Sequence, residues 1–170
     1  RNAFHWTHID ALNDTDVPAG RSGTTCVTCL VDEDYIHVAH VGDSRALLVT
    51  ENDDGNTAVI VSTTTESTVA NYPNEAARIE KAEGRIDGQG NVWYGPVGIS
   101  MTRALGDGVL LRAGVVPTPF VESWPRPSTG PASSTLILAT DGIWDVLSNE
   151  DVCNNVRDSS IEEQIADQIV

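Results

Sequence analysis

The sequence predicts an α+β fold that combines antiparallel sheets with helices. The first observation is a series of runs rich in β-branched and aromatic residues, at 24–31, 35–41, 45–50 and 57–62. The second is that only brief polar turns separate these runs, and connections this short make neighbouring strands antiparallel. The third is the apolar spacing of helices, which recurs near the N-terminus, after Pro73 and towards the C-terminus.

The remaining elements follow from helix and turn signals. Residues 3–12 have helical spacing, and the turn-rich stretch 13–20 ends it. Pro73 stands in the first turn of a helix that Gly84 ends. Residues 87–91 form a turn between two brief strands, 85–86 and 92–94. Further along we expect strands at 98–107 and 120–124, with a loop at 108–119 between them and a linker at 125–134. Two more helices are expected to begin with capping pairs, Ser148 with Asp151 and Ser160 with Glu163.

The chain has the size and composition of one domain with its own core. Its 170 residues are 40% hydrophobic, and no apolar run is long enough to cross a bilayer. The net charge of −15 would repel nucleic acid and anionic membranes and would attract divalent cations. Because three cysteines cannot all pair and the first residues show no signal-peptide pattern, we expect an intracellular protein, cytoplasmic or nuclear. We also expect a monomer.

Three short patterns are similar to binding motifs but lack the rest of each motif. His5 and His8 are neighbours on a helix, yet we expect surface histidines rather than metal ligands. Cys26 and Cys29 form C-x-x-C within a β-like run, where we expect buried small residues rather than a zinc or redox pair. The acidic turn at 51–56 lacks the closing Glu and the helices of a calcium loop, so it predicts a hairpin tip.

The most informative stretch is 136–147, an apolar run that ends at Asp141 and Gly142. It predicts a buried strand that delivers one carboxylate to the edge of a sheet. A carboxylate beside so much apolar surface needs a compensating positive charge, and a divalent cation is the natural candidate. Asp145 lies four residues on, where a helical turn would bring it to the same side. The alternative is that Asp141 forms an Asx turn and Asp145 caps a helix.

A further aspartate, Asp43, directly follows the run at 35–41 and Gly42. The glycine allows a tight turn, and we expect the Ser44 hydroxyl and the Arg45 guanidinium to hold this loop in one shape. The alternative is an ordinary turn aspartate.

Four motifs occur in a defined order and at defined separations: Ser22–Thr25, Val41–Ala46, Met101–Asp107 and Ala139–Val146. Together they resemble the metal-dependent protein serine/threonine phosphatases, the type 2C or PPM family, from about residue 3 to residue 156. The resemblance implies a four-layer α-β-β-α sandwich of two antiparallel sheets flanked by helices. It makes residues 1–170 a partial catalytic domain, incomplete at both ends. It further implies Mg²⁺ or Mn²⁺ as the cofactor, and hydrolysis of phosphoserine and phosphothreonine in a phosphorylated protein substrate by a metal-activated water.

The resemblance assigns metal-binding roles to three aspartates. Asp141 matches the aspartate that binds one ion of a binuclear pair, while Asp43 and Asp145 match acids around a weaker third ion. Hard cations prefer carboxylate oxygens and keep several of their own waters, so few protein ligands suffice. A second set matches positions that shape loops: Arg45, Arg103 and Asp107.

The chain also departs from the family's pattern. It lacks the Asp-Gly-His-Gly stretch that supplies a bridging Asp and the proton donor, the phosphate-binding Arg and the closing Asp-Asn, and it has Ser67 and Thr68 where many members have Asp-His. We therefore assign no catalytic residue to this chain and expect the proton donor and the phosphate-binding Arg upstream of it. Of the family's main metal ligands the sequence contains only Asp141. The 170 residues by themselves are therefore expected to bind metal weakly and to hydrolyse little substrate. The alternative function is a catalytically inactive regulatory or binding module, against which the retained aspartates count.

Overall fold

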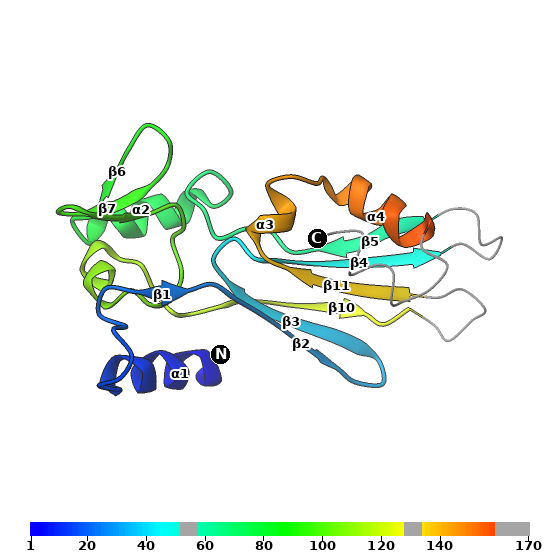
Figure 1. Ribbon diagram of the computed structural model, residues 1–170, viewed down its shortest axis with the longest axis horizontal. Helices are drawn as coiled ribbons and strands as arrows, with labels where there is room; N and C mark the ends of the chain where they lie inside the picture. The colour runs from blue at the N-terminus through cyan, green and yellow to red at the C-terminus, as the bar shows by residue number, and fades with distance from the viewer. Residues whose placement is uncertain (52–57, 128–133, 159–170) are drawn as a thin grey trace. The chain divides into compact units, whose positions relative to one another are not determined.

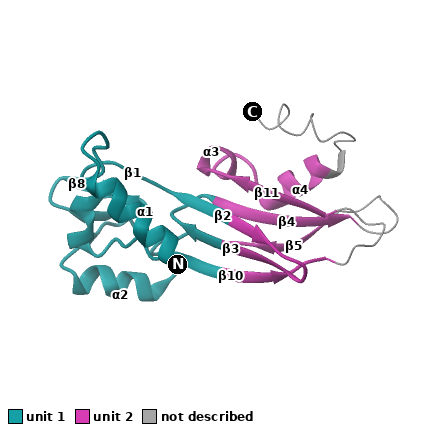
Figure 2. Cartoon of the chain, turned by 90° about the horizontal axis from the view of Figure 1, so that it is seen from below, with its two compact units in different colours: residues 1–28, 39–44, 65–121 teal, residues 29–38, 45–64, 122–170 magenta. Residues whose placement is uncertain are grey.

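The structure, a computed structural model, describes residues 1–51, 58–127 and 134–158 (Figure 1). The chain divides into two compact units, coloured separately in Figure 2. The first unit consists of residues 1–28, 39–44 and 65–121, and the second of residues 29–38, 45–64 and 122–170. Each unit is described by itself. Both helices and antiparallel strand pairs are present, which confirms the α+β fold class.

The helices lie close to where the sequence predicts them. The described residues include α1 (Asn2–Asn13), α2 (Pro73–Lys81), α3 (Asp141–Trp144), α4 (Asn149–Asp158) and a 3-10 helix, η1 (Gly108–Ala113). The 3-10 helix occupies part of the segment expected to be a loop. Within the described ranges, none of these helices combines the length and the apolar character that crossing a bilayer requires.

The strands form one two-stranded and three three-stranded sheets within the described residues. They are β1 (Gly23–Thr24), β2 (Cys26–Val31), β3 (Tyr35–Val41), β4 (Arg45–Glu51), β5 (Ala58–Thr63), β6 (Arg85–Ile86), β7 (Val92–Tyr94), β8 (Val97–Ile99), β9 (Leu105–Gly106), β10 (Phe120–Pro125) and β11 (Ser134–Ala139). β1 pairs with β9, and the larger sheets have the orders β10-β3-β2, β11-β4-β5 and β6-β7-β8. The predicted β-prone runs and the predicted hairpin of β6 and β7 are therefore confirmed. The antiparallel pairing expected across the short turn at 42–44 is wrong, because β3 and β4 belong to different sheets.

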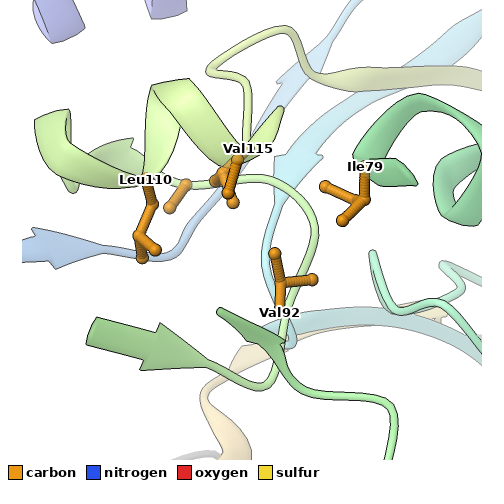
Figure 3. Packing of buried hydrophobic residues seen from close by; sticks show 6 residues of the cluster. Ile79, Val92, Leu110 and Val115 are labelled. Carbon is orange, nitrogen blue, oxygen red and sulfur yellow. The ribbon is translucent and has the colours of Figure 1, made fainter. Parts of the chain in front are cut away.

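The main core of the first unit lies between α2, β7 and η1. Figure 3 shows the side chains of Ile79, Val92, Leu110 and Val115 turned towards a common interior. Ile79, Val92 and Leu110 are fully buried, and full burial of such a side chain contributes about 1.5–3 kcal/mol each. This apolar packing fixes the position of α2 against η1 and the segment that precedes it.

Helix α1 packs on the first unit through Phe4 and His8, which are its buried residues. Phe4 clusters with Val41 and Leu105. His8 is only 3% exposed, and its Nδ1 accepts a hydrogen bond from the backbone N–H of Gly106 over 3.1 Å. Burial, with the nearby His5, lowers the pKa of His8. The expectation of two surface histidines is thus wrong for His8, because the helix turns it towards β9.

The second unit contains the sheet β11-β4-β5, and α4 covers one of its faces (Figure 1). Val152 and Cys153 of α4 pack there against Leu47 and Val49 of β4. β11 pairs antiparallel with β4 and is the edge strand of this sheet. Leu138 of β11 is 44% exposed. The prediction of a buried strand is therefore wrong for Leu138, since an edge strand has a neighbour on one side only, while most of β11 is half-buried.

The ends of several elements differ from the predictions. The capping pair at the start of α4 is confirmed, because the Asp151 carboxylate accepts hydrogen bonds from the backbone N–H and the hydroxyl of Ser148. After α2 the left-handed residue is Glu83 (φ 62°) rather than Gly84. The strand predicted at 98–107 is instead β8 and β9, separated by residues that bond to other loops. Three predicted features lie wholly or partly outside the described residues: the hairpin tip at 51–56, the linker at 125–134 and the helix starting at Ser160.

Candidate metal centre

Asp141 begins helix α3, and Asp145 is the C-cap residue that follows it. Thr140 is the N-cap residue of α3, in extended conformation. The backbone N–H of Asp145 donates to the carbonyl oxygen of Asp141 over 2.8 Å, which closes one helical turn. Residues four apart share one helix face, so Asp141 and Asp145 lie on the same side of this turn. The turn expected between them is confirmed.

Both carboxylates of α3 are available to a ligand. Asp141 and Asp145 are exposed, and within the described residues neither side chain takes part in a hydrogen bond or an ion pair. An Asx turn or a cap would use these oxygens on backbone N–H groups, so those alternatives find no support in the described part of the chain.

Trp144 and Arg45 fix α3 to the sheet of the second unit. Trp144 is buried, and its indole N–H donates to the carbonyl oxygen of Ala139 over 2.8 Å. Ala139 pairs with Arg45 in the register of β11 and β4. The Arg45 guanidinium lies 4.9 Å from the centre of the Trp144 ring and donates to Oδ1 of Asn149 over 2.7 Å. These contacts tie β4 to α3 and the start of α4, and the expected role of Arg45 in holding the Asp43 loop stays a prediction.

Asp43 lies in the tight turn between β3 and β4, in the first unit. Gly42 has a positive φ of 86°, and its carbonyl oxygen accepts a hydrogen bond from the backbone N–H of Ser67 over 2.9 Å. The hydroxyl of Ser44 is buried and lies 2.7 Å from the hydroxyl of Thr25. The turn therefore has one defined shape, as predicted for Ser44, and Asp43 is half-buried within it.

Replacing Gly42 by Ala is expected to destabilise the first unit by about 2–4 kcal/mol. A Cβ on Gly42 would overlap the side chain of Thr25 and approach Sδ of Met101 to 3.1 Å, in a backbone conformation that only Gly adopts freely. Urea unfolding measures the effect. Gly88→Ala is the control, because no atom lies within 4 Å of a Cβ there. Equal stability of the two variants would contradict the described turn.

The predicted ligands are of the type that a hard divalent cation prefers, but they are fewer than its coordination requires. Mg²⁺ and Mn²⁺ prefer oxygen ligands, and Mg²⁺ takes about six of them in octahedral geometry. Asp141 and Asp145 supply carboxylate oxygens from the second unit, while Asp43 belongs to the first. Across residues 1–51, 58–127 and 134–158, no three His, Cys, Asp or Glu side chains form a group that would hold a metal ion. The gathering of all three aspartates at one site remains a prediction.

Comparisons with known proteins identify the family. The family model described as Protein phosphatase 2C matches residues 1–170. The chain belongs to the protein phosphatase 2C family. Probable protein phosphatase 2C 12 of Oryza sativa subsp. japonica is 41% identical over 144 residues, 79% of this chain and 36% of the relative. Probable protein phosphatase 2C 61 of Arabidopsis thaliana is 36% identical over 157 residues, 87% of this chain and 47% of the relative. The chain thus spans less than half the length of these phosphatase 2C relatives.

Solved structures share the phosphatase 2C fold. The crystal structure of serine-threonine phosphatase 2C from Toxoplasma gondii superposes with a TM-score of 0.76 at 21% identity, over 99% of this chain and 57% of that chain. The structure of a C. elegans sex determining protein superposes with a TM-score of 0.64 at 25% identity, over 88% of this chain and 35% of that chain. The likeness to the first of these shows the fold alone, and it covers the segments that carry all four family motifs.

A buried ion cluster around Glu75 holds one of these motifs, Met101–Asp107, against α2. Oε2 and Oε1 of Glu75 accept hydrogen bonds from Nε and a terminal nitrogen of Arg103 over 2.8 and 2.9 Å. Arg78 forms a second ion pair with Glu75, and the Thr102 hydroxyl donates to Oε2 over 2.8 Å. Sequence reasoning missed this cluster. The sequence signal for it was the pair of Glu75 and Arg78, which lie three residues apart on α2 and therefore on one helix face.

Arg103 makes two further contacts that fit its predicted loop-shaping role. A terminal nitrogen donates to the carbonyl oxygen of Thr118 over 2.8 Å, and the guanidinium lies 3.5 Å from the centre of the Phe120 ring. Phe120 in turn stacks on Tyr72 with ring centres 4.1 Å apart. Arg103 therefore connects the phosphatase 2C motif to α2 and to the start of β10.

Glu75 makes the free energy of unfolding of the protein depend on pH in the acid range. Burial alone would raise the pKa of Glu75, but hydrogen bonds from Arg103, Arg78 and Thr102 outweigh it and lower the pKa from 4.5 to about 2. A carboxyl whose pKa is depressed on folding stabilises the folded state above its unfolded pKa, and this contribution is lost as pH falls towards the folded pKa. We expect a loss of about 3 kcal/mol between pH 4.5 and pH 2.

The measurement is urea unfolding of the wild type and of Glu75→Gln at pH 7, 4.5, 3 and 2. Subtracting the free energy of unfolding of the variant from that of the wild type removes the contribution of other acids with lowered pKa values, among them Asp32 and Asp151. The stability difference between the two proteins should shrink as the pH falls. A difference that is the same at every pH would contradict the assignment to Glu75.

Asp107 ends the motif in a strained conformation. Its φ of 49° and ψ of 42° are left-handed, which is uncommon for a residue other than Gly. Its backbone N–H donates to the carbonyl oxygen of Ser22 over 2.8 Å, and its carboxylate packs where a side chain on Gly23 would stand. Burial raises the pKa of Asp107. These contacts join the segment after β9 to β1, which fits the predicted loop-shaping role.

The three cysteines are free thiols. Cys26 and Cys29 on β2 are half-buried, and burial raises the pKa of both thiols. A raised pKa favours the neutral thiol over the thiolate that zinc binding and thiol exchange need. Neutral thiols fit the expected role of Cys26 and Cys29 as small packing residues, although both side chains are half-buried rather than fully buried.

Proposed function

We propose that this chain is part of a Mg²⁺- or Mn²⁺-dependent phosphatase that hydrolyses phosphoserine and phosphothreonine in proteins. The observation that carries the proposal is the pair of exposed carboxylates of Asp141 and Asp145, which have no partner among the residues that the structure describes. Membership of the protein phosphatase 2C family supports the reaction class. The fixed position of α3, set by Arg45 and Trp144, supports a site rather than a mobile acidic surface.

Each side chain has a distinct task in this proposal. Asp141 and Asp145 would hold a cation, and Asp43 is proposed as a further metal ligand. A cation bound there would supply the Lewis acidity that makes water nucleophilic near neutral pH and would offset charge on the phosphoryl oxygens. Arg45 orients α3 by packing on Trp144 rather than by touching the substrate. The proton donor and the phosphate-binding arginine are expected outside this chain.

The expected setting of the protein follows from its charge. A net charge of −15 disfavours nucleic acid and anionic membranes as partners, and it draws divalent cations to the surface. We propose a phosphorylated protein as the substrate, a monomer as the functional form, and the cytoplasm or nucleus as the compartment.

A phosphatase assay tests the proposal. The protein at its full native length should release phosphate from a phosphothreonine peptide in the presence of Mn²⁺ or Mg²⁺, and EDTA should abolish the release. The 170 residues by themselves should show little turnover. Metal-independent hydrolysis by the full-length protein would contradict the proposed chemistry. No hydrolysis with any metal would favour the inactive binding module instead.

A further inference from the structure

A Ser-His-Asp arrangement lies in the second unit, where β10 is the sheet neighbour of β3 (Figure 1). His37 is on β3, Ser123 is on β10, and Asp32 is in the turn between β2 and β3. Nδ1 of His37 lies 2.8 Å from the hydroxyl oxygen of Ser123, and Nε2 of His37 lies 2.9 Å from Oδ2 of Asp32. One imidazole therefore connects a hydroxyl to a carboxylate, with both contacts at hydrogen-bond distance. None of the three residues is among the aspartates assigned to the metal centre.

The turn that contains Asp32 holds its side chain in place. Oδ1 of Asp32 accepts hydrogen bonds from the backbone N–H of Tyr35 over 2.7 Å and of Asp34 over 2.9 Å. These two bonds, and after them the bond from His37, lower the pKa of Asp32, so its carboxyl group is ionised near neutral pH. Because Oδ1 is committed to the backbone, Oδ2 is the oxygen that faces His37.

The Asp32 carboxylate decides which nitrogen of the neutral His37 ring carries the proton. An ionised carboxylate only accepts hydrogen bonds, so Nε2 of His37 carries the proton and donates it to Oδ2. Nδ1 then has a free lone pair and accepts the hydrogen bond that the Ser123 hydroxyl donates. A serine nucleophile needs this direction, because its proton already points at a base that a carboxylate holds from the other side.

The arrangement is open to a reactant. Ser123 is exposed, and the side chains of His37 and Asp32 are 38% and 48% exposed. Tyr35 stacks on His37 with ring centres 5.9 Å apart and is itself 45% exposed. Alternate residues of a strand point to the same face, so the Tyr35 ring lies on the face of β3 that carries His37. An aromatic ester that approaches Ser123 therefore meets an exposed ring beside the base.

We propose that Ser123 is a nucleophile that takes the acyl group of an activated carboxylic ester, with His37 as its general base and Asp32 as a positioning residue. The Ser123 hydroxyl oxygen attacks the carbonyl carbon of the ester, and its proton passes to Nδ1 of His37. The bond from that carbon to the leaving phenolate oxygen breaks, and an ester of Ser123 remains. The Asp32 carboxylate stabilises the imidazolium that forms. This activity goes beyond the proposed function and needs no metal ion.

The test treats the full-length protein with p-nitrophenyl acetate, follows the release of p-nitrophenolate and locates the acetyl group by peptide mass spectrometry. The acetyl group should appear on Ser123, and Ser123→Ala should remove the rapid phase of release. Ser134 is the internal control in the same unit, because its hydroxyl bonds to that of Thr50 over 3.0 Å rather than to an imidazole. Acetylation of Ser134 should be about a hundredfold slower, the lower end of the contribution of a general base, since the site is open to water.

Two variants separate general-base chemistry from a structural role. His37→Gln keeps a polar side chain but removes the base, and it should slow acetylation of Ser123 about a hundredfold. In Asp32→Asn the amide oxygen still serves the turn, but the amide N–H faces Nε2, which moves the ring proton of His37 to Nδ1. This variant should slow acetylation to a similar extent. Its thermal unfolding should stay close to that of the wild type, and nitrogen NMR of His37 should report the exchanged ring proton.

The result that would overturn the inference is acetylation of Ser123 at the rate of Ser134, or at the wild-type rate in both His37→Gln and Asp32→Asn. Phosphate release from a phosphothreonine peptide should be the same in the wild type and in Ser123→Ala. The acetylation result does not depend on that release, so the proposed phosphatase function and the reactivity of Ser123 can fail separately.

Discussion

Replacing Glu75 by Gln is expected to lower the free energy of unfolding by about 3–5 kcal/mol. Glu75 is 3% exposed and neutralises Arg78 and Arg103. Without its charge, two guanidinium groups stay partly buried with no other anion paired to them within the described part of the chain. The Thr102 hydroxyl would also lose its charged acceptor. Chemical unfolding followed by Trp fluorescence measures the change.

Glu80→Gln is the matched control for this experiment. Glu80 lies on the same helix, α2, but is exposed, so its replacement should change stability by less than about 0.5 kcal/mol. If Glu75→Gln were as mild as Glu80→Gln, the ion cluster would not organise the first unit as described.

Replacing Asp141 by Asn is expected to reduce metal-dependent phosphatase activity of the full-length protein by about a hundredfold or more. The amide keeps the shape of the side chain but removes the charge that attracts a hard cation. Because Asp141 is exposed and its carboxylate has no partner within the described residues, folding should be unaffected. Steady-state kinetics at increasing Mn²⁺, together with thermal unfolding, measure both quantities.

Glu150→Gln controls for the loss of one negative charge in the same unit. Glu150 lies in the first turn of α4 and is exposed, so its replacement should leave kcat and the Mn²⁺ dependence unchanged. Wild-type kinetics in Asp141→Asn would remove this residue from the site. A loss of stability in that variant would indicate a structural role for Asp141 instead.

Features set by local spacing could be predicted from the sequence. The runs at 35–41 and 45–50 become β3 and β4 because their β-branched and apolar residues favour extended backbone locally. Their partners could not be predicted in this way, because β3 and β4 lie in different sheets. Asp141 and Asp145 lie on one helical face because a four-residue separation fixes this once a helix begins. The Ser148 cap of α4 is equally local.

Features set by tertiary contacts could not be predicted in this way. His8 is buried because α1 packs on β9, ninety-eight positions along the chain from its bonding partner Gly106. The pairing of Glu75 with Arg103 joins residues 28 positions apart. Arg45 contacts Trp144 because the register of β11 on β4 brings Ala139 opposite Arg45. None of these partnerships leaves a pattern in a single sequence.

The central claim is that Asp141 holds a hard cation at the end of β11. Calorimetric titration of Mn²⁺ and of Mg²⁺ into the full-length protein and into Asp141→Ala tests it most directly. We predict saturable binding to the wild type and clearly weaker binding of both ions to the variant. Equal affinity and stoichiometry in the two proteins would contradict the claim.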